Sequence, residues 1–177
     1  MLLLYRLIGA FGLGVFLAGG LPAMGSDKGA ADEVAADEKK NLLEVLEEDG
    51  EFTMFLRAVA ETDLQEKFTE KGPYTVFAPS DEAFDLLPSE VLDLLMSPGQ
   101  QYFRTRLLSH HVLADSVTSS DNRGEGEQSV ETIAGTRLAV ISEGDLFYVE
   151  AAEVKARDME ASNGMVHRID RILVPGN

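Results

Sequence analysis

The 177-residue chain contains no cysteine, so a disulfide, a thiolate nucleophile and a cysteine-ligated metal site are all excluded. Cations are scarce as well: 15 lysines and arginines stand against 31 acids, for a formal net charge of −16. A surface of this sign repels phosphate backbones, which argues against nucleic acid as a partner. Sequons for N-glycosylation, phosphate-binding loops and dinucleotide fingerprints are also missing from the sequence.

The N-terminal segment has the pattern of an export signal. A single cation, Arg6, precedes an apolar run over residues 7–18, and Ala23-Met24-Gly25 supplies small residues where a signal peptidase cleaves. We therefore predict a secretory signal peptide over residues 1–25, with an uncleaved membrane anchor as the alternative. Residues 26–39 are rich in alanine and acids and predict a solvated linker, followed by one folded domain over residues 40–177.

The first half of that domain has helical periodicity. Apolar residues at helical spacing predict helices around residues 42–49 and 52–59, and Asp63 with Glu66 forms a capping-box pattern before a third. Two further helices are expected at 91–96 and 102–108, separated by Ser97-Pro98-Gly99.

The second half has the pattern of strands. Residues 137–141 and 146–149 predict a hairpin, residues 152–155 continue the sheet, and Asn163-Gly164 predicts a type I′ turn before the last strand. The apolar phase then shifts, which predicts a bulge near Asp170-Arg171. We interpret Asp121 to Gln128 as an exposed loop. Helices followed by antiparallel strands make an α+β domain.

The stretch Thr75 to Phe84, TVFAPSDEAF, offers a serine beside two acids. Its simplest interpretation is a buried strand ended by Pro79, with Ser80 as the N-cap of a new helix and Asp81 in its first turn. A nucleophilic serine needs a base and oxyanion donors, and no Gly-x-Ser-x-Gly elbow is present. A hydrolase that uses Ser80 or a pair of acids is the lowest-ranked hypothesis, and we assign no catalytic residue.

The adjacent pair His110-His111 is a poor chelate, because neighbouring side chains on an extended segment point to opposite faces. We expect one ring to lie inward on a backbone carbonyl and the other to be exposed. A metal site that combines one of them with His167 is the alternative.

Three stretches together resemble the fasciclin-type adhesion domain. Gly72 to Pro88 is similar to the family's leading signature, Leu107 to Asp121 to its central histidine segment, and Ser162 to Pro175 to its closing signature. In the second, His111 takes the family histidine and His110 stands where a tyrosine is common. The resemblance runs from about residue 40 to the C-terminus.

The resemblance implies a fold and a set of structural residues. The fold is a β-wedge of antiparallel and mixed strands flanked by a layer of short helices, with the two signature strands side by side in the core. The signature positions are Ser80, Asp81, His111, Asn163, Gly164 and His167. Animal members that bind integrins carry an Asp-Ile pair before the closing signature, and the matching residues here are Asp158 and Met159.

The resemblance also implies a function. It is that of an exported, non-enzymatic module that binds a protein or a surface or matrix component in cell adhesion, with no cofactor and no metal. The candidate contact residues are Asp158, Met159, His110 and His111, and the expected location is secreted, periplasmic or at the cell surface of a Gram-negative bacterium. A periplasmic carrier of a small ligand or metal is the alternative. Adhesion needs two attachments, so an uncleaved signal segment or a homodimer would have to supply the second.

Overall fold

The structure is a computed structural model and describes residues 39–119 and 126–175. The predicted signal peptide and nearly all of the predicted linker lie outside the described residues. The elements, in chain order, are α1 (Leu42–Asp49), α2 (Thr53–Ala60), α3 (Leu64–Thr69), β1 (Tyr74–Pro79), α4 (Asp81–Asp85), α5 (Ser89–Met96), α6 (Gln101–His110), β2 (Val112–Leu113), β3 (Gly126–Glu131), β4 (Arg137–Glu143), β5 (Leu146–Val149), β6 (Ala152–Ala161) and β7 (Gly164–Ile169).

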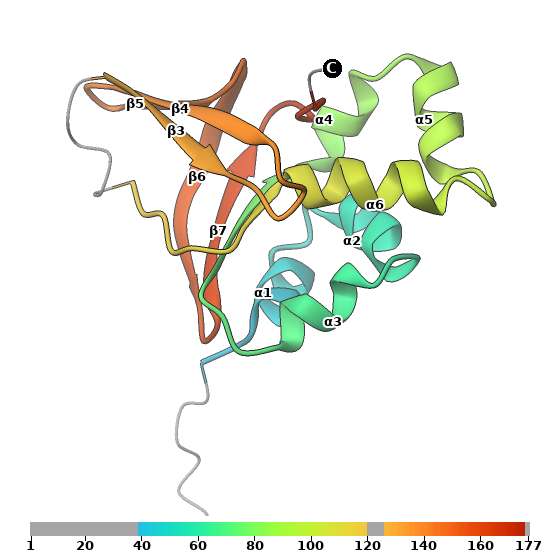
Figure 1. Ribbon diagram of the computed structural model, residues 1–177, viewed down its shortest axis with the longest axis horizontal. Coiled ribbons are helices and arrows are strands. Elements are labelled where there is room, and N and C mark those ends of the chain that lie inside the picture. Colours follow the sequence, from blue (N-terminus) through green and yellow to red (C-terminus); the bar gives the residue numbers. More distant parts are fainter. Residues whose placement is uncertain (1–38, 120–125, 176–177) are drawn as a thin grey trace, which may run out of the picture. The chain divides into compact units, whose positions relative to one another are not determined.

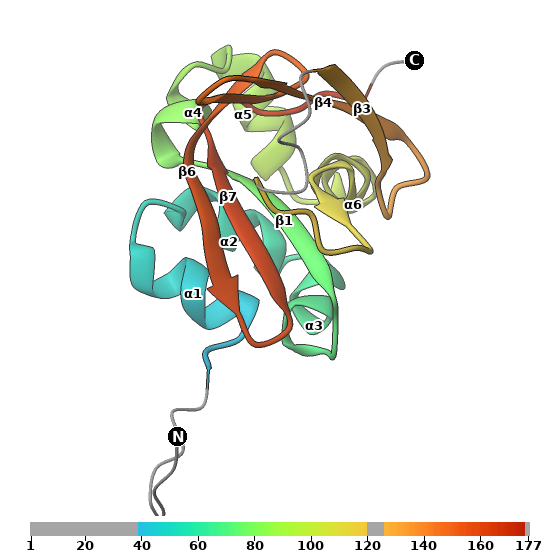
Figure 2. The ribbon, with the colours of Figure 1, turned by 90° about the vertical axis from the view of Figure 1, so that its left-hand side faces the viewer.

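The strands form one seven-stranded mixed sheet in the order β2-β1-β7-β6-β5-β4-β3. The first strand, β1, pairs in parallel with the last, β7, and every other pairing is antiparallel. Figure 1 shows the six helices gathered on one side of the domain and the strands β3 to β6 on the other, and Figure 2 shows β1, β6 and β7 running side by side. The predicted α+β class and the wedge of mixed strands are confirmed.

The two signature strands β1 and β7 are buried on both faces, so the domain has two apolar cores. Val76, Ala78 and Val166 face the helices and pack with α1, α2 and α6. On the opposite face, Phe77 and Ile169 pack inside the wedge against apolar residues of β4 and β5. Successive side chains of a strand point to opposite faces, and this alternation lets each central strand join the two cores.

Local signals fix the first helix as the sequence predicts. Asn41 caps α1 through Oδ1, which accepts from the N–H of Glu44 at 3.1 Å, and the Glu44 carboxylate returns a bond to the N–H of Asn41 at 2.8 Å. This reciprocal pair is a capping box. Gly50 ends the helix with φ of 79°, a left-handed conformation that favours glycine.

Four local predictions are wrong in detail. Asp63 makes no capping bond to α3; the hydroxyl of Thr62 accepts from the N–H of Leu64 instead. Residues Ser162 and Asn163 form the turn between β6 and β7, and neither Asn163 nor Gly164 has the positive φ that a type I′ turn requires.

The predicted bulge is also displaced. β7 ends at Ile169 without the expected irregularity at Asp170-Arg171, and the register shifts occur in β6, between Val154 and Met159. The exposed loop predicted over 121–128 is partly wrong as well, because Gly126 begins β3, while residues 121–125 lie outside the described chain.

A buried arginine joins three helices. The side chain of Arg104 is 3% exposed and lies 2.5 Å from the carboxylate of Glu61, at the end of α2. Its Nε donates to the carbonyl of Leu95 and Nη2 to that of Ser97, at the C-terminal end of α5. The guanidinium thus satisfies carbonyls that a helix end leaves without partners.

Candidate binding surface

The serine of the stretch Thr75 to Phe84 is a structural residue. Ser80 is 7% exposed and occupies the N-cap position of α4, but its hydroxyl makes no capping bond. The neighbouring carboxylate of Asp81 caps a different helix, since Oδ1 accepts from the N–H of Met54 at 2.8 Å and Oδ2 from that of Thr53 at 3.2 Å. In this motif the backbone of Ser80 begins α4, and the carboxylate of Asp81 caps the start of α2. No histidine ring is hydrogen-bonded to Ser80 in the described chain.

His111 is fully buried and bonded through both ring nitrogens. Nδ1 lies 2.8 Å from the carbonyl of Leu107, and Nε2 accepts from the N–H of Leu173 at 2.9 Å. Because Nε2 accepts, the neutral ring must carry its proton on Nδ1 and donate it to Leu107. Burial lowers the pKa of His111 to about 4, so the ring is neutral at pH 7.

His110 is also buried, at 3% exposed, so the expectation that one of the pair is exposed is wrong. The reason is that His110 ends α6 rather than lying on an extended segment, and its Nδ1 sits 2.5 Å from the hydroxyl of Thr136. Burial lowers the pKa of His110, partly offset by the negative charge of Glu150. On the described domain, neither His110 nor His111 presents a ring to a partner at the surface.

His167 lies inside the wedge, stacked on Phe77 with the ring centroids 5.3 Å apart. Its Nε2 donates to the carbonyl of Val117 at 2.8 Å, and its Nδ1 accepts from the N–H of Asp158 at 3.2 Å. Burial lowers the pKa of His167. The ring thereby ties β7 to β6 and to the segment that follows β2.

Asp158 stands at the irregularity of β6 and has φ of 53°, which is uncommon for a residue with a side chain. Its carboxylate accepts from the backbone N–H of Ser119 at 2.8 Å and from the Ser119 hydroxyl. Burial acts to raise the pKa of Asp158, but the two hydrogen bonds from Ser119, together with the interactions with His167 and Arg157, outweigh it and the pKa is lowered. Met159 is half-buried and packs against the helical core.

Sequence reasoning did not identify Ser119 or Glu160 as part of this site. Ser119 lacks a local signal, because its bond to Asp158 spans 39 residues. Glu160 follows the candidate pair and has a side chain that is 66% exposed, in an ion pair with Lys39. The alternation of a strand predicts that Glu160 and Asp158 share a face, and this signal could have pointed to Glu160.

Asn163 connects the last hairpin to two helices. Its Nδ2 donates to the carbonyls of Phe68 and Glu70, at the end of α3, and its Oδ1 accepts from the N–H of Leu42, at the start of α1. The surrounding backbone leaves no room for side chains at two glycines. A Cβ on Gly72 would overlap the carbonyl of Asn163, and one on Gly164 would overlap the carbonyl of Tyr74.

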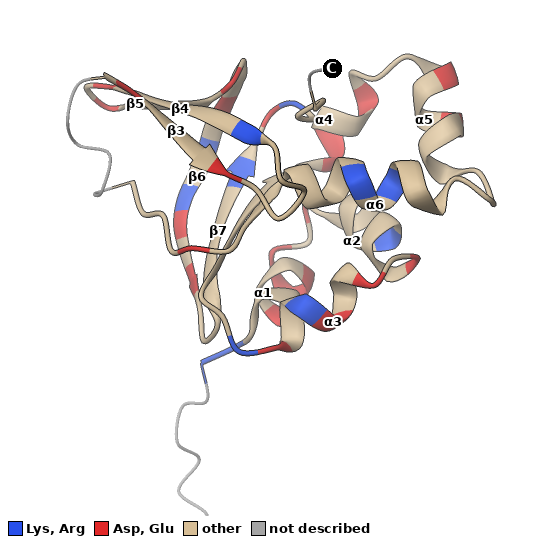
Figure 3. Cartoon of the chain, in the orientation of Figure 1, with Lys and Arg blue, Asp and Glu red and all other residues tan. Residues whose placement is uncertain are grey.

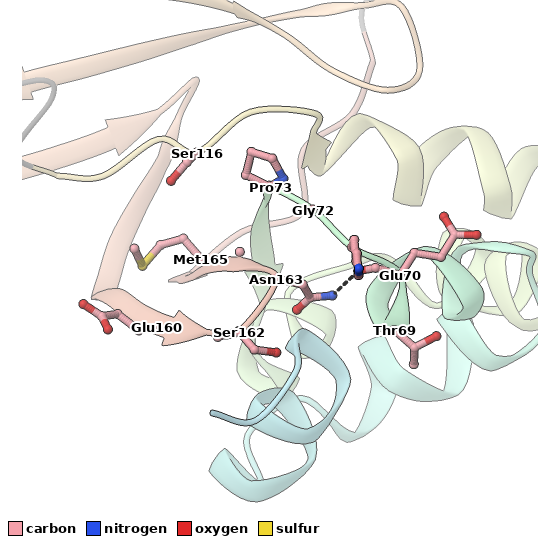
Figure 4. Close-up of a pocket in the computed structure, with 12 residues that line it drawn as sticks. Thr69, Glu70, Gly72, Pro73, Ser116, Glu160, Ser162, Asn163 and Met165 are labelled. Carbon is pink, nitrogen blue, oxygen red and sulfur yellow. Dashed lines mark hydrogen bonds between the residues drawn. The ribbon is translucent and has the colours of Figure 1, made fainter. Parts of the chain in front are cut away.

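An open pocket of about 610 Å³ lies beside this junction. Figure 4 shows Asn163 and Glu70 on one side of it and Glu160, Met165 and Ser116 on the other. Glu160 and Ala161, which follow Asp158 and Met159 in β6, line the pocket, whereas Asp158 and Met159 themselves do not. We call Asp158, Met159, Glu160 and Ser116, with the pocket, the β6 surface.

The histidines offer few ring nitrogens that could bind a metal ion. Five of their six ring nitrogens are hydrogen-bonded to protein groups. Within residues 39–119 and 126–175, no group of three or more histidine or acidic side chains is arranged to hold a metal ion. Figure 3 shows Asp and Glu distributed over helices and strands alike.

Among the residues that the structure describes, no helix is both long enough and apolar enough to span a bilayer.

Comparison with known proteins agrees with this architecture. The chain is 32% identical over 143 residues to protein sll1483 of Synechocystis, covering 81% of this chain and 78% of the relative. It is 34% identical over 104 residues to the cell surface glycolipoprotein MPB83 of Mycobacterium bovis, covering 59% of this chain and 44% of that protein.

A solved structure, a FAS1 domain pair from the insect cell adhesion molecule fasciclin I, matches with a TM-score of 0.68 at 19% identity. The match covers 76% of this chain and about half, 51%, of that structure, and at this identity it supports the fold alone. The model of the Fasciclin domain family matches residues 35–175. The resemblance in the sequence is thereby confirmed: the chain belongs to the fasciclin domain family.

Proposed function

We propose that this protein is an exported, non-enzymatic binding module that mediates cell-surface or matrix adhesion through contacts with other proteins. Support comes from the fasciclin domain family itself and from a relative named as a cell surface glycolipoprotein. The observation that best supports a non-enzymatic role is that the side chains that could act in catalysis are engaged in structural hydrogen bonds. His111 and His167 bond through both ring nitrogens, and Asp81 caps α2.

The partner in this proposal contacts the β6 surface. Asp158 and Met159 shape it, because the positive φ at Asp158 turns the backbone and Ser119 fixes the carboxylate. Glu160 carries the exposed charge next to the pocket of Figure 4. Side chains in well-packed pockets usually dominate the binding energy of such interfaces, and exposed charges at the rim set partner choice and the association rate.

The test is chemical crosslinking of the exported protein on living cells, followed by identification of the captured proteins. We expect Glu160→Lys to reduce capture by about tenfold or more, since reversing one charge at an interface weakens complementary contacts. The fold should survive, because the exposed Glu160–Lys39 pair contributes at most about 1 kcal/mol.

The matched control is Glu90→Lys, the same charge reversal on the exposed surface of α5. It should leave capture unchanged. Equal capture by wild type, Glu160→Lys and Glu90→Lys would remove the β6 surface from the proposal, and no specific capture by wild type would contradict the adhesive role. The mass of the exported protein would show whether residues 1–25 are removed and whether a homodimer forms.

A further inference from the structure

The strand β3 is a long exposed edge of the sheet. It ends the strand order and pairs with β4 alone. Five of its six residues are exposed, and Figure 2 shows it at the margin of the strands, away from β7. An edge of this kind presents backbone N–H and C=O groups in a row, ready to pair with another strand.

The pairing register shows which groups face the open side. Ala139 of β4 turns its backbone toward β5, because its carbonyl accepts from the N–H of Glu150 at 2.7 Å. Ala139 stands opposite Ser129, so these two residues are a non-hydrogen-bonded pair and the N–H and C=O of Ser129 point away from β4. The alternation of an antiparallel ladder places the backbone groups of Glu127 outward as well. Within the described residues, neither outward N–H has a backbone partner.

A hollow of about 450 Å³ runs along this free edge. Ser129, Val130 and Glu131 line it on one side, and Leu113, Asp115 and Val117 on the other. At one end the two sides meet, through a bridge between Leu113 and Thr132 and a bond from the N–H of Ile133 to the carbonyl of Val112 at 2.8 Å. The sheet is therefore nearly closed, with an open seam between β3 and the segment after β2.

The side chains at the seam specify the chemistry of an occupant. Val117 and Val130 are partly buried against the inner core and give the seam an apolar floor. Asp115 and Glu131 line the hollow, and Glu127 is exposed beside it. Among the described residues of the β3–β4 pairing, the one cation is Arg137 of β4, which lies opposite Glu131. The balance is negative, so the seam favours a positively charged strand with apolar residues at alternate positions.

A second copy of the chain is a poor occupant. Antiparallel pairing of two β3 strands about Ser129 would place Glu127 of each copy opposite Glu131 of the other. Like charges directly opposite destabilise a strand pair, and charged residues on an edge are a means of preventing self-association.

We propose that the seam between β3 and residues 113–117 binds an extended, basic peptide segment of a partner protein by strand addition. The outward groups of Glu127 and Ser129 supply the backbone hydrogen bonds, and the acids select lysine or arginine. The inference rests on the proposed function in that it names a partner class for a binding module. It also supplies the second attachment point that adhesion by a single domain requires. Of the segment 113–117, Ser116 belongs to the β6 surface and does not line the seam, so the residues that line the two sites differ.

The experiment titrates the full chain with the blocked peptide Lys-Val-Lys-Val-Lys-Val and follows hydrogen exchange of the β3 amides by NMR. We expect the N–H groups of Glu127 and Ser129 to exchange about tenfold or more slowly with saturating peptide, because they gain partners. The amides of Gln128 and Val130, already directed to β4, should change less. The same peptide with N-methylated backbone and the peptide Glu-Val-Glu-Val-Glu-Val should bind about tenfold more weakly or worse.

The blocking variant is Ser129→Pro, with Ser129→Ala as its control. Proline removes the outward N–H, which is not used in the β3–β4 pairing, and proline is tolerated at such edge positions. We expect Ser129→Pro to keep the wild-type unfolding temperature within a few degrees and to lose at least tenfold in peptide affinity. Ser129→Ala should bind as wild type does.

In the peptide experiments, any of these results would overturn the inference: unchanged affinity in a folded Ser129→Pro protein, equal binding of the N-methylated peptide, or equal binding of the acidic peptide. Dimerisation of the wild type that Ser129→Pro abolishes would identify a second copy as the occupant and contradict the proposal. If Ser129→Pro does not fold, Glu127→Lys with Glu131→Lys replaces it, and unchanged affinity for the basic peptide would then reject the seam.

The outcome is separable from that of the adhesion experiment. Cell-surface capture without peptide binding at the seam would leave the proposed function standing and reject this inference. Peptide binding at the seam without cell-surface capture would support this inference and contradict the proposed function.

Discussion

Nε2 of His111 accepts a hydrogen bond from the backbone N–H of Leu173, 2.9 Å away and 62 positions further along the chain. The acceptor exists only while the ring is neutral, since a protonated imidazole donates from both nitrogens. One histidine therefore anchors the C-terminal segment to the end of α6, and protonation would break the anchor.

This contact predicts a loss of stability in acid. The pKa of His111 falls from 6.5 to about 4 on folding because the ring is buried. Above pH 6.5 the neutral ring is present in both states and its contribution is complete. Between pH 6.5 and 4 the unfolded chain takes up a proton that the native state resists, so the free energy of unfolding declines, by about 3 kcal/mol once pH is below 4.

Urea unfolding at pH 7 and pH 4.5 measures this decline. The variant His111→Gln cannot titrate and should be less stable at pH 7, but it should lose less stability in acid than wild type. His110 and His167 also have lowered pKa values and leave a residual decline in the same direction. An identical loss in wild type and variant would contradict the assignment to His111.

The cap on α2 gives a second prediction. Asp81→Ala removes the acceptor for the N–H groups of Thr53 and Met54 and should lower the free energy of unfolding by about 1–2 kcal/mol. Ser80→Ala, one residue earlier, removes no capping bond and should change it by less than about 0.5 kcal/mol. Chemical denaturation of both variants checks the pair, and a larger effect at Ser80 than at Asp81 would reverse the roles found here.

Gly164 gives a third prediction. A Cβ at this position would overlap the carbonyl of Tyr74, so Gly164→Ala must push β7 away from β1 and should destabilise by about 3 kcal/mol or more. Gly99→Ala is the control: Gly99 has φ of 91° but open space around it, so only backbone strain of about 1 kcal/mol applies. Thermal unfolding compares the two, and equal shifts in unfolding temperature would mean that the close approach to Tyr74 has no special cost.

Much of the fold could be predicted from local patterns. Helical periodicity places α1 and α2, the Ser97-Pro98-Gly99 breaker separates α5 from α6, and alternation identifies the β4–β5 hairpin. The resemblance of three motifs placed the two signature strands, β1 and β7, side by side, and the structure adds that they pair in parallel. The capping box of Asn41 and Glu44, which the structure adds, likewise joins residues only three positions apart.

Predictions about individual polar groups were less successful. Asp63 and Ser80 have the sequence of caps, but neither side chain makes a capping bond, and the type I′ turn at Asn163-Gly164 did not form. Asn163 instead uses its amide on α1 and α3, which are far away along the chain. β3 was missed because its polar residues lack a buried face.

The sequence by itself determined the approximate position of most helices and strands and which family the chain resembles, because these depend on periodicity, breakers and motif order within short windows. Only the tertiary structure decided that both adjacent histidines are buried, that Asp81 caps α2, and that a seam remains open beside β3. These depend on which groups meet across tens of residues, and burial, hydrogen-bond partners and free edges are properties of the packed chain.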